Sequence, residues 1–268
     1  MPTERIPNLL HFLLFLALTF FAFLACEGLA LAIAHPHPLL QGLLDQRLQL
    51  LASAGAYLVA LAVAWFTFPA IWQRSFLAGL HWNAARLRPL LALVGIMLGF
   101  AAQGVETLLP IPKNLPIEVA FRDAGSIWFL AFFGTLVAPL FEEIVFRGFL
   151  LPAVAIAVDW VRIPRSADPL ASLEHLEAWR VSQAFSPLAL TVASLVTSLA
   201  FALIHAPQLG YTWSAVGLLA AVSLVLCFIR IRTNSVAAST VVHASYNLSV
   251  FLSLFAATSG FRHLERMR

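Results

Sequence analysis

The chain has 268 residues, of which 61% are hydrophobic and 11% are charged, with a mean hydropathy of +0.88. A soluble domain carries about 25% charged residues. This chain therefore has too little charge to cover a water-exposed surface of its size, which excludes a soluble globular protein. The formal net charge of +3 is small. We interpret it as basic loops beside lipid headgroups, with no nucleic-acid partner.

Seven apolar segments are long enough to cross a bilayer, which requires about 20 mostly apolar residues. In chain order they are Leu9–Ala34, Leu48–Ile71, Leu90–Leu109, Ile127–Val158, Pro187–Ile204, Ala215–Ile229 and Ser235–Ala257. The sixth segment is short, and the fourth is long enough that we expect it to tilt or to break near Pro139. These segments predict an all-α, polytopic transmembrane helix bundle of about seven spans, with six to eight possible.

Other parts of the chain carry weaker signals. The first segment could serve as a signal peptide, but it is longer than the usual apolar region of about 7–15 residues, so we interpret it as a span. In the polar loop Asp159–Ser186, the apolar spacing over Leu170–Val181 predicts a short interfacial helix. Cys26 and Cys227 lie far apart in apolar runs and form no CxxC pair, which argues against a disulfide framework or a cysteine metal site.

Ionisable side chains inside the predicted spans are the candidate functional residues, because such groups are costly in a membrane. They are His11, Glu27, Glu106, Glu142, Glu143, Arg147, His205 and His243. We assign no role to Glu27 or Glu106.

The most informative cluster is Glu142-Glu143-x-x-x-Arg147 in the fourth span. Successive residues of a helix are rotated by about 100°, so Glu143 and Arg147, four apart, share one face and can form an ion pair. Glu142 is offset from that face, so its carboxylate is not paired with Arg147 and is available for catalysis. The alternative is a purely structural ion pair between helices.

Two further polar pairs follow along the chain. In Phe201-x-x-x-His205 the histidine ends an apolar helix just before Pro207, and in His243-x-x-x-Asn247 two polar side chains share one helix face. Two hydrogen-bonding groups one turn apart can stabilise an oxyanion. Each pair also has a structural interpretation, His205 as an interfacial cap and the other pair as polar contacts between helices.

Together these motifs resemble the CPBP family, which includes the type II CAAX prenyl endopeptidases and bacteriocin-processing and immunity-type proteins. The family pattern is EExxxR, then FxxxH, then HxxxN on separate spans, and all three are complete and in order here. The resemblance covers roughly Ala131–Leu254. It divides the chain into N-terminal spans without a recognised motif (1–125), a catalytic core (126–258) and a basic C-terminal tail (259–268).

The resemblance implies a polar intramembrane cavity and a glutamic-type peptide hydrolase. It implies that Glu142 activates water together with His205, that Glu143 and Arg147 support the site, and that His243 and Asn247 stabilise the oxyanion. No cofactor is expected. Zinc is the less favoured alternative, since a glutamate and two histidines can ligate it, but the chain has no HExxH pair.

The resulting hypothesis is an intramembrane endopeptidase that acts on a membrane-associated substrate, such as a prenylated protein or one that carries a leader or sorting signal. The expected location is a bacterial inner membrane. One alternative is a non-catalytic binding or immunity protein that uses the same polar cluster. Another is a proton-coupled transporter, but we find no internal repeat of the kind common in transporters.

Overall fold

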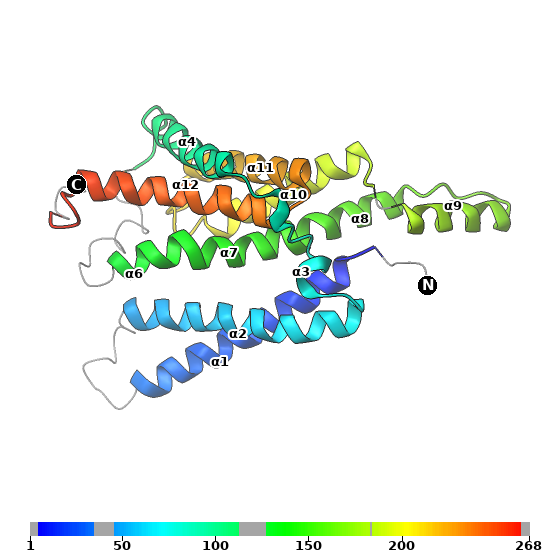
Figure 1. Ribbon diagram of the computed structural model, residues 1–268, viewed down its shortest axis with the longest axis horizontal. Helices are drawn as coiled ribbons and strands as arrows, with labels where there is room; N and C mark the ends of the chain where they lie inside the picture. The colour runs from blue at the N-terminus through cyan, green and yellow to red at the C-terminus, as the bar shows by residue number, and fades with distance from the viewer. Residues whose placement is uncertain (1–4, 35–45, 113–126, 183, 264–268) are drawn as a thin grey trace.

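The computed structural model describes residues 5–34, 46–112, 127–182 and 184–263. Within this part of the chain every regular element is a helix, and seven helical segments are long and apolar enough to cross a membrane (Figure 1). They are Leu9–Ile33, Leu48–Trp72, Pro89–Glu106, Ile127–Val161, Pro187–Ile204, Trp213–Thr233 and Val236–Ala257. The predicted all-α fold with seven spans is confirmed. The sixth span is longer than predicted: it begins two residues earlier and ends four residues later.

The predicted division into three segments stays a prediction. Its first boundary, between residues 125 and 126, lies outside the described residues, as do residues 264–268 of the predicted tail.

The first two helices form an antiparallel pair along one side of the bundle (Figure 1). They are α1 (Leu9–Ala34) and α2 (Gln46–Trp72). Ala56, Ala60 and Ala64 are fully buried on one face of α2, and small residues at this spacing allow two helices to approach closely. Phe15 of α1 stacks on Phe149 of the fourth span, with ring centroids 4.5 Å apart. The α1–α2 pair thus packs against the part of the fourth span that comes just after the EExxxR motif.

A second close contact joins α4 (Pro89–Glu106) to α12 (Val236–Ala257). A Cβ atom added at Gly95 would collide with the carbonyl oxygen of Val242, and one added at Gly99 would collide with Oγ of Ser249. The two backbones can lie this close only because these positions carry no side chain.

The fourth span is helical throughout, from Ile127 to Val161. It consists of α6 (Ile127–Phe132), the π-helical turn η3 (Phe133–Val137), α7 (Ala138–Glu143), the π-helical stretch η4 (Ile144–Leu150) and α8 (Leu151–Val161). Of the two expected outcomes, a tilt or a break near Pro139, the break does not occur: the helix widens into a π turn just before the proline and continues through it. The tilt stays a prediction. π turns inside helices frequently occur at functional sites.

The remaining long helices are α10 (Pro187–Ile204) and α11 (Trp213–Thr233). The helix predicted over Leu170–Val181 is present as α9 (Pro169–Val181), which extends beyond α8 at one end of the molecule (Figure 1). Its position in the membrane interface stays a prediction.

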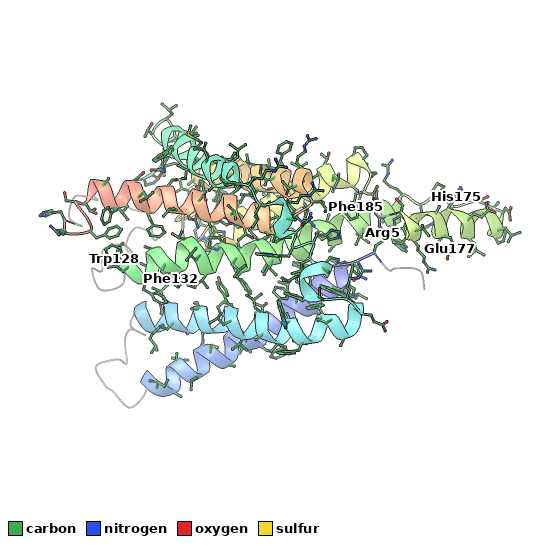
Figure 2. All side chains as sticks on the ribbon, in the orientation of Figure 1. Arg5, Trp128, Phe132, His175, Glu177 and Phe185 are labelled. Atoms are coloured by element: carbon green, nitrogen blue, oxygen red, sulfur yellow. The ribbon has the colours of Figure 1, made fainter. Side chains whose placement is uncertain are left out.

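The N-terminal segment contacts the loop before α10 through Arg5. Arg5 donates a hydrogen bond of 2.7 Å to the carbonyl oxygen of Ala184, and its guanidinium lies 4.6 Å from the ring centroid of Phe185. Figure 2 shows the labelled Arg5 and Phe185 side by side. Asp159 at the end of α8 lies 3.7 Å from Arg5 and accepts a hydrogen bond of 2.6 Å from the Ser186 hydroxyl.

The connection between α2 and α4 packs against the start of α12. It contains α3 (Phe76–Gly79) and the 3-10 turn η2 (Ala84–Arg86). The carbonyl oxygen of His81 accepts a hydrogen bond of 3.1 Å from the amide of Val236. Burial, followed by repulsion from Arg230 and Arg74, lowers the pKa of His81 to about 4. The imidazole is therefore neutral at neutral pH.

Candidate active site

Three helices bring the predicted site residues together. Glu142 lies on α7, His205 caps the C-terminus of α10, and His243 lies on the second turn of α12. One carboxylate oxygen of Glu142 is 3.7 Å from Nε2 of His205, and the other is 3.7 Å from Nε2 of His243. The carboxylate that has no partner on its own helix therefore lies between two imidazoles from other spans.

Glu143 does not line the cavity and is fully buried. Its Oε1 lies 2.9 Å from Nη1 of Arg147, whose side chain is also fully buried, so the predicted ion pair is formed. The second guanidinium nitrogen of Arg147 donates to Oγ and to the carbonyl oxygen of Ser223 on α11, at 2.6 and 3.1 Å. The guanidinium lies 4.8 Å from the ring centroid of Phe201. The pair thus links the fourth span to α10 and α11.

His243 connects the two glutamates. Its Nδ1 lies 3.0 Å from Oε1 of Glu143. A carboxylate paired with an arginine can only accept hydrogen bonds, so Nδ1 carries a proton and Nε2 faces Glu142. Sequence reasoning missed this contact, because the two residues lie 100 positions apart and on different helices.

His205 is oriented in the same way. Its Nδ1 lies 2.7 Å from the carbonyl oxygen of Phe201 in the same helix. A carbonyl oxygen only accepts, so Nδ1 is again the protonated nitrogen and Nε2 is directed to Glu142. The FxxxH spacing explains the geometry, since a histidine four residues after Phe201 can reach back to the Phe201 carbonyl. Both imidazoles thus present Nε2 to the same carboxylate.

Asn247 makes a contact that the sequence did not predict. Its Nδ2 donates a hydrogen bond of 2.6 Å to the carbonyl oxygen of Gly134 in the π turn η3. In this turn the amide of Ala138 bonds to Phe133 instead of Gly134, and the next residue, Pro139, has no N–H to offer. The Gly134 carbonyl thus lacks the donor that a regular helix supplies, and Asn247 replaces it.

A cavity of about 780 Å³ lies beside these residues. Glu142, His205, His243 and Asn247 line it, while Glu143 and Arg147 do not. Most of the lining is apolar. Four of the six predicted site residues thus face the cavity, and the buried ion pair lies behind them.

The remaining ionisable residues of the predicted spans differ in their position relative to the cavity. Glu106, at the end of α4, lines the cavity. Glu27 is exposed on α1 and does not line it. His11 packs edge-on against Trp72, with ring centroids 5.6 Å apart, and its Nδ1 accepts a hydrogen bond from the amide of Asn8.

A metal ion would need several donor side chains grouped around one point. Among the described residues, no group of three or more His, Cys, Asp or Glu side chains is arranged to hold one. The polar cluster as it stands is a carboxylate–imidazole arrangement, with oxygen–nitrogen separations of 3.7 Å.

The helices define the chain as a multi-pass integral membrane protein with a polar cluster facing a cavity between its spans. Residues 124–249 match the family described as type II CAAX prenyl endopeptidase Rce1-like. The match confirms the resemblance to the CPBP family, and the matched segment contains all three motifs. No curated protein and no solved structure matches the chain. The family indicates a CAAX-type intramembrane peptidase with a peptide substrate in the membrane.

Proposed function

We propose that this protein is an intramembrane endopeptidase that hydrolyses a peptide bond of a membrane-associated substrate by activating water at Glu142 and His205. The substrate is a prenylated chain or one with a leader or sorting signal, and the expected location is a bacterial inner membrane. The observation that carries the proposal is the position of Glu142 in the cavity wall, with Nε2 of His205 and of His243 each 3.7 Å away.

Separations of 3.7 Å are too long for direct hydrogen bonds, so both groups can bond to a water molecule in the cavity. In the proposed reaction a water molecule is bound between Glu142 and His205. Glu142 takes a proton from this water as its oxygen attacks the scissile carbonyl carbon. The proton then passes to the amide nitrogen as the carbon–nitrogen bond breaks, which leaves a carboxyl and an amine terminus.

His243 and Asn247 are proposed to hold the oxyanion. The Nδ1 proton of His243 is directed to Glu143, so donation from Nε2 requires the doubly protonated imidazolium. Asn247 commits one N–H to Gly134 and has a second N–H for the substrate. Glu143 and Arg147 support the site by fixing the ring of His243.

The reaction is proposed to need no metal or other cofactor. Zinc is the alternative, with Glu142, His205 and His243 as ligands. The two are distinguished by incubating the purified protein with 1,10-phenanthroline and measuring bound metal and peptide cleavage together. A metal-free enzyme keeps its full cleavage rate with no stoichiometric metal, whereas a zinc enzyme loses activity and regains it when zinc is restored.

The test compares the peptides released from membranes that contain the wild-type protein or Glu142→Gln. Glu27→Gln is the matched control, because Glu27 is an intramembrane glutamate outside the cavity wall. We expect a set of peptides that disappears in Glu142→Gln and persists in Glu27→Gln. Identical peptide sets from the wild type and Glu142→Gln, with both proteins folded, would overturn the proposal.

The other two candidate functions make different predictions. A non-catalytic binding or immunity protein keeps its cellular phenotype in Glu142→Gln and His205→Ala. A proton-coupled transporter shows pH-dependent flux in liposomes.

A further inference from the structure

Glu106 is a second charged group in the cavity, and the proposed reaction does not use it. It is the last residue of α4 and lines the cavity together with Gln103, one turn earlier. The close contact of Gly95 and Gly99 with α12 fixes α4 against the helix that carries His243 and Asn247. The position of Glu106 relative to the catalytic group is therefore set by rigid helix packing.

The stability of α4 does not explain an acidic residue at this position. A negative charge at the C-terminal end of a helix faces the negative end of the helix dipole, which is unfavourable. In the described part of the chain Glu106 forms no salt bridge. The phenol of Tyr246, which precedes Asn247 on α12, lies close enough to Glu106 to interact with its charge.

The composition of the lining defines what fits the cavity. Among the residues that the structure describes, carboxylate and imidazole groups occur at four lining positions, Glu142, His205, His243 and Glu106, and of these only Glu106 lies outside the catalytic group. Most of the remaining wall is apolar, with residues such as Leu130, Leu218 and Val250. A complementary ligand has an apolar body and one positively charged group.

We propose that Glu106 is a specificity-determining residue, which binds a lysine or arginine side chain of the peptide substrate while the scissile bond lies at Glu142. The inference rests on the proposed function, because it assigns a class of peptide to the same cavity. In an apolar peptide with one basic residue at a fixed distance from the scissile bond, the apolar side chains contact the cavity wall. The basic side chain reaches Glu106 while the scissile bond lies at Glu142.

Binding tests the inference without relying on turnover. The probe is a nine-residue peptide of leucine and alanine with one lysine, which is moved along the peptide one position at a time. The matched probe has the uncharged norleucine in place of lysine. Both are titrated onto the full-length protein in detergent for the wild type, Glu106→Gln, Glu106→Asp and Glu27→Gln.

The wild type is expected to bind the lysine peptide about two- to fivefold more tightly than the norleucine peptide at one lysine position. High salt should reduce this preference, because it screens exposed charges. Glu106→Asp and Glu27→Gln keep the preference, and Glu106→Gln loses it while binding the norleucine peptide as before. A preference that persists in Glu106→Gln, or that is absent from the wild type, overturns the inference.

The two proposals fail in different ways. A protein that cleaves peptides in a Glu142-dependent manner, but does not prefer lysine, contradicts only the role of Glu106. A protein that binds the lysine peptide through Glu106, but cleaves nothing, contradicts the proposed hydrolysis.

Discussion

Glu142 and Glu143 are neighbours in the chain, yet their side chains have different surroundings. Glu143 is fully buried and contacts Arg147 at 2.9 Å and His243 at 3.0 Å. Glu142 faces the cavity between two Nε2 atoms. The helical rotation of about 100° between adjacent residues accounts for the difference. One carboxylate is thus held inside the protein and the other is available to substrate.

The buried ion pair predicts a large stability effect for Arg147→Ala. The substitution leaves the Glu143 carboxylate buried without its cation, which costs about 3–5 kcal/mol in comparable pairs. The control is Arg180→Ala, since Arg180 and Glu177 form an exposed pair at 3.1 Å on α9, where about 1 kcal/mol or less is expected. The measurement is unfolding of both variants in the same detergent. Equal destabilisation by the two substitutions would contradict the structural role of Arg147.

At this scale the sequence predicts contacts within a helix and misses those between helices. The pairing of Glu143 with Arg147 follows from a spacing of four residues. The bonds from His243 to Glu143 and from Asn247 to Gly134 join residues 100 and 113 positions apart. The second also depends on the π turn, which no sequence pattern apart from Pro139 indicates.

The π turn before Pro139 is the element that places Asn247. Because Asn247 is the donor for the Gly134 carbonyl, Asn247→Leu is expected to destabilise the protein by about 1–3 kcal/mol. A residue used only to stabilise the oxyanion would lose activity without this cost. The measurement is the free energy of unfolding, compared with peptide cleavage by the same preparation.

A double-mutant cycle with Pro139→Ala sharpens this prediction. Alanine at position 139 restores a backbone N–H five residues after Gly134, which can donate to the Gly134 carbonyl in the π geometry. Asn247→Leu should therefore cost less in the Pro139→Ala background than in the wild type, with a coupling of about 0.5 kcal/mol or more. Additive effects would show that the two residues do not serve the same carbonyl.

The contact between α4 and α12 predicts opposite results for two glycines of one helix. Gly99→Ala places a methyl group against Ser249, and overpacking of this kind costs about 1–3 kcal/mol. A Cβ atom at Gly104 meets nothing within 4 Å, so Gly104→Ala should be neutral or stabilise by up to about 1 kcal/mol. Thermal unfolding in detergent measures both. Comparable losses in the two variants would contradict the close packing.

The helices themselves were largely predictable, because length and hydrophobicity determine which segments span a membrane. The fourth span was the exception. A proline inside a helix removes one hydrogen bond, so a break near Pro139 was one of the two outcomes that we expected, beside a tilt of the whole span. The chain instead widens the preceding turn and satisfies Gly134 from another helix, an arrangement that depends on tertiary packing.

For the molecule as a whole, His81 predicts how stability depends on pH. Its pKa in the folded protein is about 4, below the ordinary value of about 6.5. The folded state therefore binds fewer protons, so the contribution to stability is complete above about pH 6.5 and is lost as the pH falls toward 4. The loss is below about 3 kcal/mol, the limit set by the pKa difference.

The His81→Asn variant tests this dependence, because asparagine tolerates the left-handed backbone at His81, where φ is 57°. Between pH 7.5 and 4.5 its stability should fall less than that of the wild type. His175→Asn, on the exposed helix α9, should follow the wild type. An identical pH profile for wild type and His81→Asn would show that His81 does not titrate in this range.

The cavity is the feature of the whole molecule that the sequence could not place. Its wall combines residues from α2, α4, the fourth span, α10 and the segment after it, α11 and α12. The motifs indicated which residues meet, but they gave no signal for Glu106, which reaches the same wall from a helix without a recognised motif.

The most direct test of the central claim is peptide hydrolysis by the purified full-length protein in water enriched in oxygen-18. The wild type is predicted to release fragments whose new C-terminal carboxyl carries the heavy oxygen. Glu142→Gln should release them at a rate lower by about 10²-fold or more, the usual contribution of a general base, while its unfolding profile matches that of the wild type. Fragments formed by Glu142→Gln at the wild-type rate would contradict the account.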